Sequence, residues 1–223
     1  MISKPLITAA DAAALVEDGM TVMIGGFMAV GTPEAIVDAL VASGRRELTI
    51  IANDTGFVDR GVGKLVANRQ VRKVIASHIG TNPETGRQMS DGVLEVELVP
   101  QGTLIERIRA HGAGLGGVLT PTGLGTVVET GKARVRVGER DFLVETPLRA
   151  DIAFIRSSRS DKAGNSAFFK TTKNFNPTMA TAADLVVCEA QQIVDVGYGR
   201  GDDFHLPGIF VDHLVAAVAQ ERR

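Results

Sequence analysis

The sequence predicts an α/β fold: an open, mostly parallel β-sheet flanked by helices, with a small β-hairpin insertion. Short apolar runs alternate with segments of helical period along most of the chain. Residues 20–52 show this alternation best, as a strand, a helix and a second strand. Such a unit joins parallel strands through a right-handed crossover. Residues 134–145 contain two strand-like runs joined through Gly138, which is typical of a hairpin.

The individual elements follow from local signals. Thr32-Pro33-Glu34 indicates a helix start, because it offers a capping hydroxyl, a proline and an acid in the first turn. Gly44 is the stop signal for this helix. The expected elements, in chain order, are a helix at 9–16, a strand at 21–24, a helix to about 43, a strand at 48–52, a weak helix at 63–68, strands at 71–77 and 93–99, a helix at 103–110, the hairpin strands 134–137 and 142–145, strands at 152–156 and 185–187, and a closing helix at 209–220. No internal repeat is evident.

The composition favours a single domain, residues 1–223, that is large enough to bury a core, since 44% of its residues are hydrophobic and 22% are charged. The formal net charge is only -2 and the 24 basic residues are scattered. This distribution argues against nucleic acid or an anionic membrane as a partner.

Several further expectations concern cysteine, targeting and metal. Cys188 is the only cysteine and lies in an apolar run, so we expect a buried structural thiol. The first residues lack the apolar core of a signal peptide, and no run is long enough for a membrane span, so a cytoplasmic location is expected. The four histidines show no paired ligand spacing, so no metal site is predicted.

A glycine-rich segment, Gly25 to Gly31, lies between a predicted strand and a predicted helix. Open parallel sheets bind ligands at such places, and the free amides of a first helical turn attract anions. A simple tight turn is the alternative. Thr32 and Pro33 stand where a nucleotide P-loop requires lysine and Ser/Thr, which excludes that motif. A dinucleotide site stays open, because Asp54 ends the next strand about where a ribose-binding acid would lie.

The segment from Asp18 through Pro33 resembles the signature of family I (3-oxoacid) CoA-transferase A, or alpha, subunits. Further similarity covers nearly the whole chain, through Ile51-Ala-Asn-Asp54, Ser77-His-Ile-Gly80, Val99-Pro-Gln-Gly-Thr-Leu104, Gly112 to Gly117, Thr120-Pro-Thr-Gly123, Asp161 to Asn165 and Asn174-Phe-Asn-Pro177. Residues 53–56 and 78–86 look most similar to the acetate, acetoacetate or butyrate enzymes. The resemblance implies the fold of such alpha subunits, with coenzyme A as a substrate rather than a permanently bound cofactor.

The resemblance also implies a ping-pong reaction with covalent catalysis. A glutamate attacks the acyl-CoA thioester, an acyl-glutamyl anhydride forms, and the released CoA thiolate gives a glutamyl-CoA thioester before a second carboxylate reverses the steps. That glutamate belongs to a Ser-Glu-Asn-Gly motif in the family's B half. The tetrapeptide does not occur here. We therefore expect a separate beta subunit, in an α2β2 assembly, to supply it, and this chain alone to be inactive.

Specific residues carry roles by the same resemblance. Gln101 matches a glutamine beside the reacting carbonyl, where it could stabilise an oxyanion from its backbone or its side chain. Asn53 and His78 match substrate-pocket positions. Glu84 invites the role of nucleophile, but a solvated turn residue is expected there. The CoA-binding loop is Gly25, Gly26, Phe27, Met28, Ala29, Val30 and Gly31.

Three other functions stay open from sequence alone. One is an NAD-dependent oxidoreductase with a Rossmann-like domain, motivated by the strand–loop–helix unit and Asp54. Another is a CoA-transferase of the 3-oxoadipate or succinyl-CoA type. The third is a regulatory or sugar-phosphate-binding module on the same kind of sheet, because fold alone does not fix function.

Overall fold

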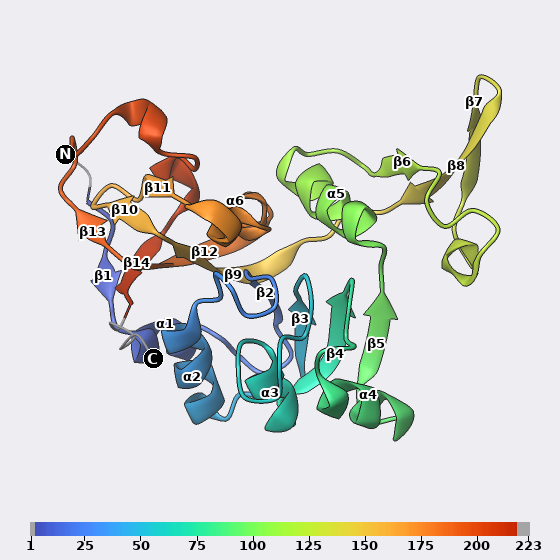
Figure 1. Ribbon diagram of the computed structural model, residues 1–223, viewed down its shortest axis with the longest axis horizontal. Helices are drawn as coiled ribbons and strands as arrows, with labels where there is room; N and C mark the ends of the chain where they lie inside the picture. Colours follow the sequence, from blue (N-terminus) through green and yellow to red (C-terminus); the bar gives the residue numbers. More distant parts are fainter. Residues whose placement is uncertain (1–2, 218–223) are drawn as a thin grey trace.

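The centre of the protein is an eight-stranded sheet, seen here in a computed structural model that describes residues 3–217. Its strands are β1 (Leu6–Ile7), β2 (Thr21–Ile24), β3 (Leu48–Ile51), β4 (Val71–Ala76), β5 (Glu95–Leu98), β9 (Ala150–Ser157), β12 (Ala183–Ala190) and β14 (His213–Ala216). They lie in the order β1-β14-β12-β9-β2-β3-β4-β5 (Figure 1), and every neighbouring pair is parallel. The predicted α/β class with a mostly parallel sheet is confirmed.

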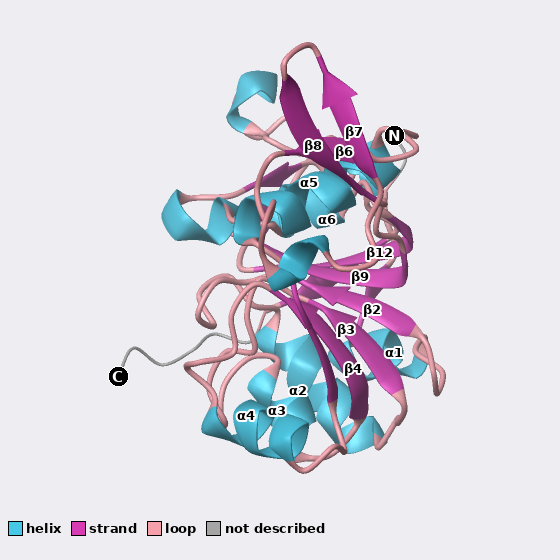
Figure 2. Cartoon of the chain, turned by 90° about the vertical axis from the view of Figure 1, so that its right-hand side faces the viewer, coloured by secondary structure: helices cyan, strands magenta, loops and turns pink. Residues whose placement is uncertain are grey.

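Helices cover both faces of this sheet (Figure 2). One face carries α1 (Ala9–Ala14), α2 (Glu34–Ser43), α3 (Gly63–Ala67) and α4 (Pro83–Ser90), and the other carries α5 (Gln101–Gly112) and α6 (Asn176–Met179). Successive strand residues point to opposite faces. In β2, Val22 and Ile24 accordingly lie in the core beneath α2 and α3, while Met23 lies in the core with Leu104 and Ile108 of α5.

The sheet reverses its strand order at β2. The chain proceeds from β2 through β3 and β4 to β5 in one direction, and β9 then pairs with the other side of β2. In open parallel sheets, ligands bind outside the carboxyl ends of the strands at such a reversal. The loop that follows Ile24 therefore occupies the position where this architecture forms a crevice.

The predicted hairpin is present, within a small antiparallel sheet of β6 (Val118–Thr120), β7 (Arg134–Val137) and β8 (Arg140–Glu145). Figure 1 shows this sheet projecting beyond α5 at the upper right. The strand β6 was not predicted. A second small sheet combines β10 (Arg159–Asp161), β11 (Ser166–Ala167) and β13 (Ile193–Val194). Short 3-10 helices occur as η1 (Val127–Glu129), η2 (Lys170–Lys173), η3 (Gly201–Asp203) and η4 (Gly208–Phe210).

The closing helix predicted at 209–220 is wrong over its described part. Residues 208–210 form η4 and residues 213–216 form β14, while 218–220 lie outside the described residues. β14 lies between β1 and β12, so Leu214 and Val215 are buried. A strand covered on both faces has a nearly continuous apolar sequence, which resembles a short buried helix.

Two other expectations concern burial and the membrane. Cys188 in β12 is buried as predicted, and this burial raises the pKa of its thiol. Within residues 3–217, no helix combines the length and the apolar character that a membrane crossing requires.

Candidate functional site

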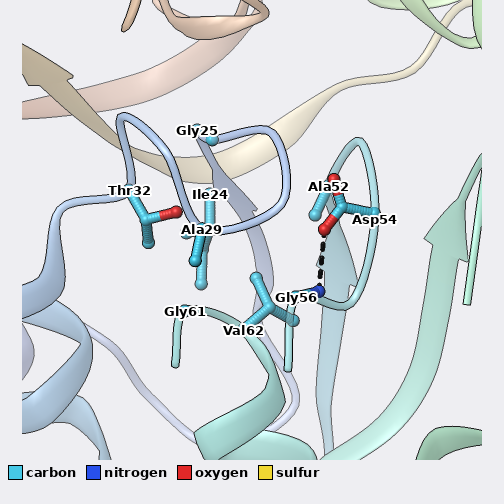
Figure 3. Close-up of a pocket in the computed structure, with 10 residues that line it drawn as sticks. Ile24, Gly25, Ala29, Thr32, Ala52, Asp54, Gly56, Gly61 and Val62 are labelled. Carbon is cyan, nitrogen blue, oxygen red and sulfur yellow. Dashed lines mark hydrogen bonds between the residues drawn. The ribbon is translucent and has the colours of Figure 1, made fainter. Parts of the chain in front are cut away.

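The loop Gly25–Gly31 follows the carboxyl end of β2 and forms a tight turn (Figure 3). Phe27 and Val30 exchange both backbone hydrogen bonds, at 3.0 and 2.9 Å. Met28 and Ala29 at the tip have φ angles of 47° and 63°, which non-glycine residues rarely adopt. Such conformations typically cost about 1–3 kcal/mol each and persist only where the surroundings enforce them. The contacts that enforce this turn therefore define the site.

Asp54 holds the loop from the side of β3. Its carboxylate accepts a hydrogen bond from the Met28 amide at 2.8 Å and another from the Gly56 amide at 2.8 Å. Figure 3 shows the second of these bonds. The residue is only 6% exposed. Both carboxylate oxygens thus accept hydrogen bonds from backbone amides. The dinucleotide hypothesis requires them to bind a ribose hydroxyl instead.

Two asparagines hold the loop from the opposite side. Asn174 accepts from the Gly26 amide at 3.2 Å and donates to the Val30 carbonyl at 3.1 Å. Asn176 donates to the Gly31 carbonyl at 3.0 Å and accepts from the backbone amide of Arg156. No role was predicted for these asparagines from the sequence. The one signal was their place in the Asn174-Phe-Asn-Pro177 segment.

The first turn of α2 differs from its prediction, because its amides are not free. The N-cap is Pro33, without a side-chain cap, and Thr32 does not cap the helix. The Ala35 and Ile36 amides instead donate to one carboxylate oxygen of Glu189, at 2.9 and 3.1 Å. That carboxylate is 1% exposed, and burial raises its pKa even though the amides lower it. A protein carboxylate therefore already occupies this anion position.

Asn53 and Gln101 meet at the carboxyl ends of β3 and β5. Gln101 donates from Nε2 to Oδ1 of Asn53 at 2.9 Å, and Ser77 Oγ donates to the same oxygen at 3.0 Å. Asn53 is buried and Gln101 is exposed. The side-chain amide of Gln101 is thus already used as a donor within the protein.

The amino end of α5 presents free backbone donors beside this pair. The amides of Gln101, Gly102 and Thr103 donate to no acceptor within residues 3–217. The Thr103 hydroxyl is also buried without a partner among the described residues. Gly102 and Thr103 line a cavity of about 470 Å³ between α5 and β6. An anion near this helix end would find unpaired N–H groups and a favourable helix dipole.

A family model described as Coenzyme A transferase matches residues 6–217 of this chain. The chain belongs to the coenzyme A transferase family. This membership replaces the oxidoreductase interpretation and agrees with the resemblance seen in the sequence. It also assigns the chain to a family that handles coenzyme A.

Curated relatives of this CoA-transferase chain are similar over nearly their whole length. The alpha subunit of the acetate CoA-transferase of Escherichia coli K12 is 54% identical over 98% of both chains. The acetoacetyl-CoA:acetate/butyrate CoA transferase alpha subunit of Clostridium acetobutylicum is 51% identical, over 89% of this chain and 91% of that one. One subunit of the probable succinyl-CoA:3-ketoacid coenzyme A transferase of Bacillus subtilis is 43% identical, over 100% and 93%.

Solved structures support the fold. An acyl-CoA transferase of Escherichia coli O157:H7 has a TM-score of 0.83 at 21% identity, with 96% of this chain and 47% of that one aligned. This CoA-transferase chain therefore spans about half the length of that protein. The glutaconate coenzyme A-transferase of Acidaminococcus fermentans has a TM-score of 0.81 at 18% identity, over 95% and 75%.

Other candidate residues of the CoA-transferase chain lie apart from the loop. His78 lies two residues after the end of β4 and forms a backbone bridge to Asp54, while its ring makes no hydrogen bond to a described residue. Glu84 was predicted to lie in a loop turn, but it belongs to the first helical turn of α4. Its hydrogen bond with Arg87 is the main reason that the pKa of its carboxyl falls to about 2. Residues 3–217 contain no cluster of three metal-ligating side chains.

We predict that Asp54→Asn weakens the binding of acyl-CoA by the complex of this CoA-transferase chain with its partner. An asparagine offers one acceptor oxygen where two amides require two, so stability should fall by about 1 to 2 kcal/mol. The released tip should raise the KM for acyl-CoA several-fold while kcat changes less. Steady-state kinetics of the complex with its partner measures this split. Asp91→Asn, which loses only an exposed pair with Arg87, is the control, and equal KM values in both variants would contradict the prediction.

Proposed function

We propose that this chain is the alpha subunit of a short-chain acyl-CoA:carboxylate CoA-transferase of the acetate/acetoacetyl-CoA type. Two relatives above 50% identity carry names of that type. The chain forms a single functional domain over residues 1–223. A separate beta subunit supplies the nucleophilic glutamate, in agreement with the absence of Ser-Glu-Asn-Gly from this sequence.

The loop binds and positions coenzyme A in this proposal. Its tip exposes Phe27, Met28 and Val30 by 37%, 40% and 49%. Apolar side chains of this size at a strand–helix junction suit contact with a flexible thioester arm. The full set of loop residues in this role is Gly25, Gly26, Phe27, Met28, Ala29, Val30 and Gly31.

The first turn of α5 stabilises the oxyanion. The observation that carries this assignment is that Gln101 uses its side-chain amide to bind Asn53, whereas its backbone N–H has no acceptor among the described residues. A preorganised backbone donor at a helix start is a suitable oxyanion partner. Asn53 positions the glutamine, and His78 lines the same pocket at the next strand end.

The remaining parts of the proposal concern assembly. Coenzyme A is a substrate, and it is carried covalently on the beta subunit during turnover. Two alpha and two beta subunits form the enzyme, in the cytoplasm. The relatives named as alpha subunits support a partner chain.

The test of this function compares the purified chain with the co-expressed pair. We expect no transfer of CoA from acetoacetyl-CoA to acetate by the chain alone, because its nucleophile is missing. Co-expression with a partner that carries Ser-Glu-Asn-Gly should restore transfer. A partner with glutamine in place of that glutamate is the matched control and should stay inactive. Full activity of the isolated chain would refute the proposal.

The acceptor range separates the two transferase types. Succinyl-CoA:3-ketoacid relatives are also similar, at 43% identity for the Bacillus subtilis chain. Competing acetate and succinate as acceptors for acetoacetyl-CoA measures the preference directly as a ratio of kcat/KM values. A preference for acetate supports the proposed type, and a preference for succinate supports the alternative.

A further inference from the structure

Two successive strand–helix connections share one sequence pattern. Gly26-Phe-Met-Ala-Val-Gly31 follows β2, and Gly56-Phe-Val-Asp-Arg-Gly61 follows β3. Both read Gly-Phe-x-x-x-Gly, and both precede a helix on the same face of the sheet. This shared pattern is confined to six residues and was not noted in the sequence.

The two loops also share one backbone hydrogen-bond pattern, although their tips differ, since only Met28 and Ala29 of the first loop have positive φ angles. Phe57 and Arg60 exchange both backbone hydrogen bonds, each at 3.3 Å, as Phe27 and Val30 do in the first loop. The glycines that flank each turn have positive φ angles in both loops. Residues 56–61 therefore resemble the glycine loop in sequence and in hydrogen bonding, and we name them the second loop.

The second loop lies against the first. A Cβ placed on Gly61 would lie 3.5 Å from the Ala29 Cβ, and Asp54 bonds amides of both loops. Figure 3 shows Gly61 and Ala29 on facing sides of a narrow gap. A larger cavity of about 530 Å³ opens over the tips, lined by Met28 to Gly31 of the first loop, by Thr32 after it and by Arg60 of the second loop.

Three cations line this larger cavity, and one of them has only a long, exposed ion pair among the described residues. Lys64 contacts both Glu34 and Asp38 at 2.5 Å, and Arg156 contacts Glu189 at 3.0 Å. Those two charges are neutralised within the protein. Within residues 3–217, the third cation, Arg60, pairs only with the exposed carboxylate of Asp59, at 3.7 Å.

The guanidinium of Arg60 is also held in place. It lies over the ring of Phe57, 4.7 Å from the ring centroid. This stacking orders the side chain without using its N–H donors. An ordered arginine with free donors, at the rim of an open cavity, is suited to bind a phosphate group.

We propose that the second loop is a second coenzyme A-binding element, in which Arg60 binds a phosphate of the nucleotide end. The inference rests on the proposed function, because CoA carries phosphates at one end and its thioester at the other. The apolar tip of the first loop then contacts the arm between them. The two loops thus contact different parts of the ligand. The first loop contacts its apolar arm, and the second loop binds its anionic end.

The test measures CoA binding by calorimetry with the alpha–beta complex. Arg60→Gln should weaken binding of CoA about tenfold, the loss of one charged hydrogen-bonding partner. Binding of pantetheine, which lacks the phosphates, should stay unchanged. Arg46→Gln is the matched control, because Arg46 precedes β3 and so lies at the amino ends of the strands, away from both loops. It should bind both ligands as the wild type does.

Three outcomes would overturn the inference: unchanged CoA binding by Arg60→Gln, equal weakening for CoA and pantetheine, or no CoA binding by the wild-type complex. The equal weakening would indicate a distorted loop rather than phosphate recognition. The proposed function fails separately, through absence of transfer activity in the wild-type complex. A wild-type complex that binds CoA without transferring it would thus refute the function and leave the binding comparison decisive.

Discussion

Gln101→Pro is expected to lower kcat of the alpha–beta complex by about 100-fold to 1,000-fold, whereas Gln101→Ala lowers it far less. Removal of one oxyanion-hole donor typically has an effect of this size. Proline lacks the backbone N–H that we assign to the oxyanion, and alanine retains it. Both variants lose the side chain that bonds Asn53 at 2.9 Å. The difference between them therefore isolates the backbone donor.

The structure at this position accepts proline. Gln101 is the first residue of α5, where proline is tolerated because its N–H has no helical acceptor. The preceding residue, Pro100, has φ −50° and ψ 133°, which is the extended conformation favoured before a proline. The helix should therefore form normally in both variants.

Two measurements decide this prediction. Thermal unfolding should give similar midpoints for Gln101→Pro and Gln101→Ala, which excludes misfolding as the cause. Kinetics should then separate the variants in kcat rather than in KM, since the donor acts in the transition state. Equal kcat values would show that the side chain, and not the backbone amide, carries the effect.

Gly25→Ala is expected to destabilise the chain by about 2 to 3 kcal/mol and to abolish most transfer activity. A Cβ at this position would overlap the side-chain oxygen of Asn176. Asn176 is fully buried and bonds the Arg156 amide and the Gly31 carbonyl, so it has no room to move away. The added methyl group must therefore displace the loop.

Chemical denaturation of the wild type and of Gly25→Ala measures the change in unfolding free energy. Gly86→Ala is the matched control, because a Cβ on Gly86 meets nothing within 4 Å and the residue lies inside α4. Alanine favours helix by about 0.5–1 kcal/mol over glycine, so this variant should be slightly stabilised. Similar stabilities for the two variants would show that the loop adapts to the methyl group.

The sequence was sufficient to predict those elements whose signals are local. The strand at 21–24, the helix that ends at Gly44 and the hairpin through Gly138 all appear as predicted. In each case a few neighbouring residues determine the structure: an apolar run, a helix stop or a tight turn. The parallel arrangement followed from the same strand–helix–strand rhythm.

Long-range contacts account for what the sequence did not predict. The strand β14 depends on β1 and β12 on either side, and its apolar residues suggested a helix when considered alone. The α2 amides bond Glu189, which lies far along the chain, so local capping signals at Thr32 were misleading. Glu84 was misplaced for a more local reason, since Asn82 and Pro83 form a helix start as readily as a turn.

The candidate site shows the same division. The sequence predicted residues 25–31 and Gln101 as candidates, from their position at strand ends and from family resemblance. Their hydrogen-bond partners were not predictable, since Asp54, Asn174 and Asn176 meet the loop only in the folded chain. The bond of the Gln101 side chain to Asn53 likewise forms only in the folded chain.

The pairing of β1 with β14 sets a constraint on how the protein is made. Among the strands of the main sheet, β1 leaves the ribosome before all the others, yet its one neighbour, β14, leaves after them. The half of the sheet from β2 to β5 pairs strands close in sequence and can assemble early, whereas β1 waits unpaired. Until residues 213–216 have been made, β1 therefore lacks the strand with which it pairs, and its backbone N–H and C=O groups stay open to other partners.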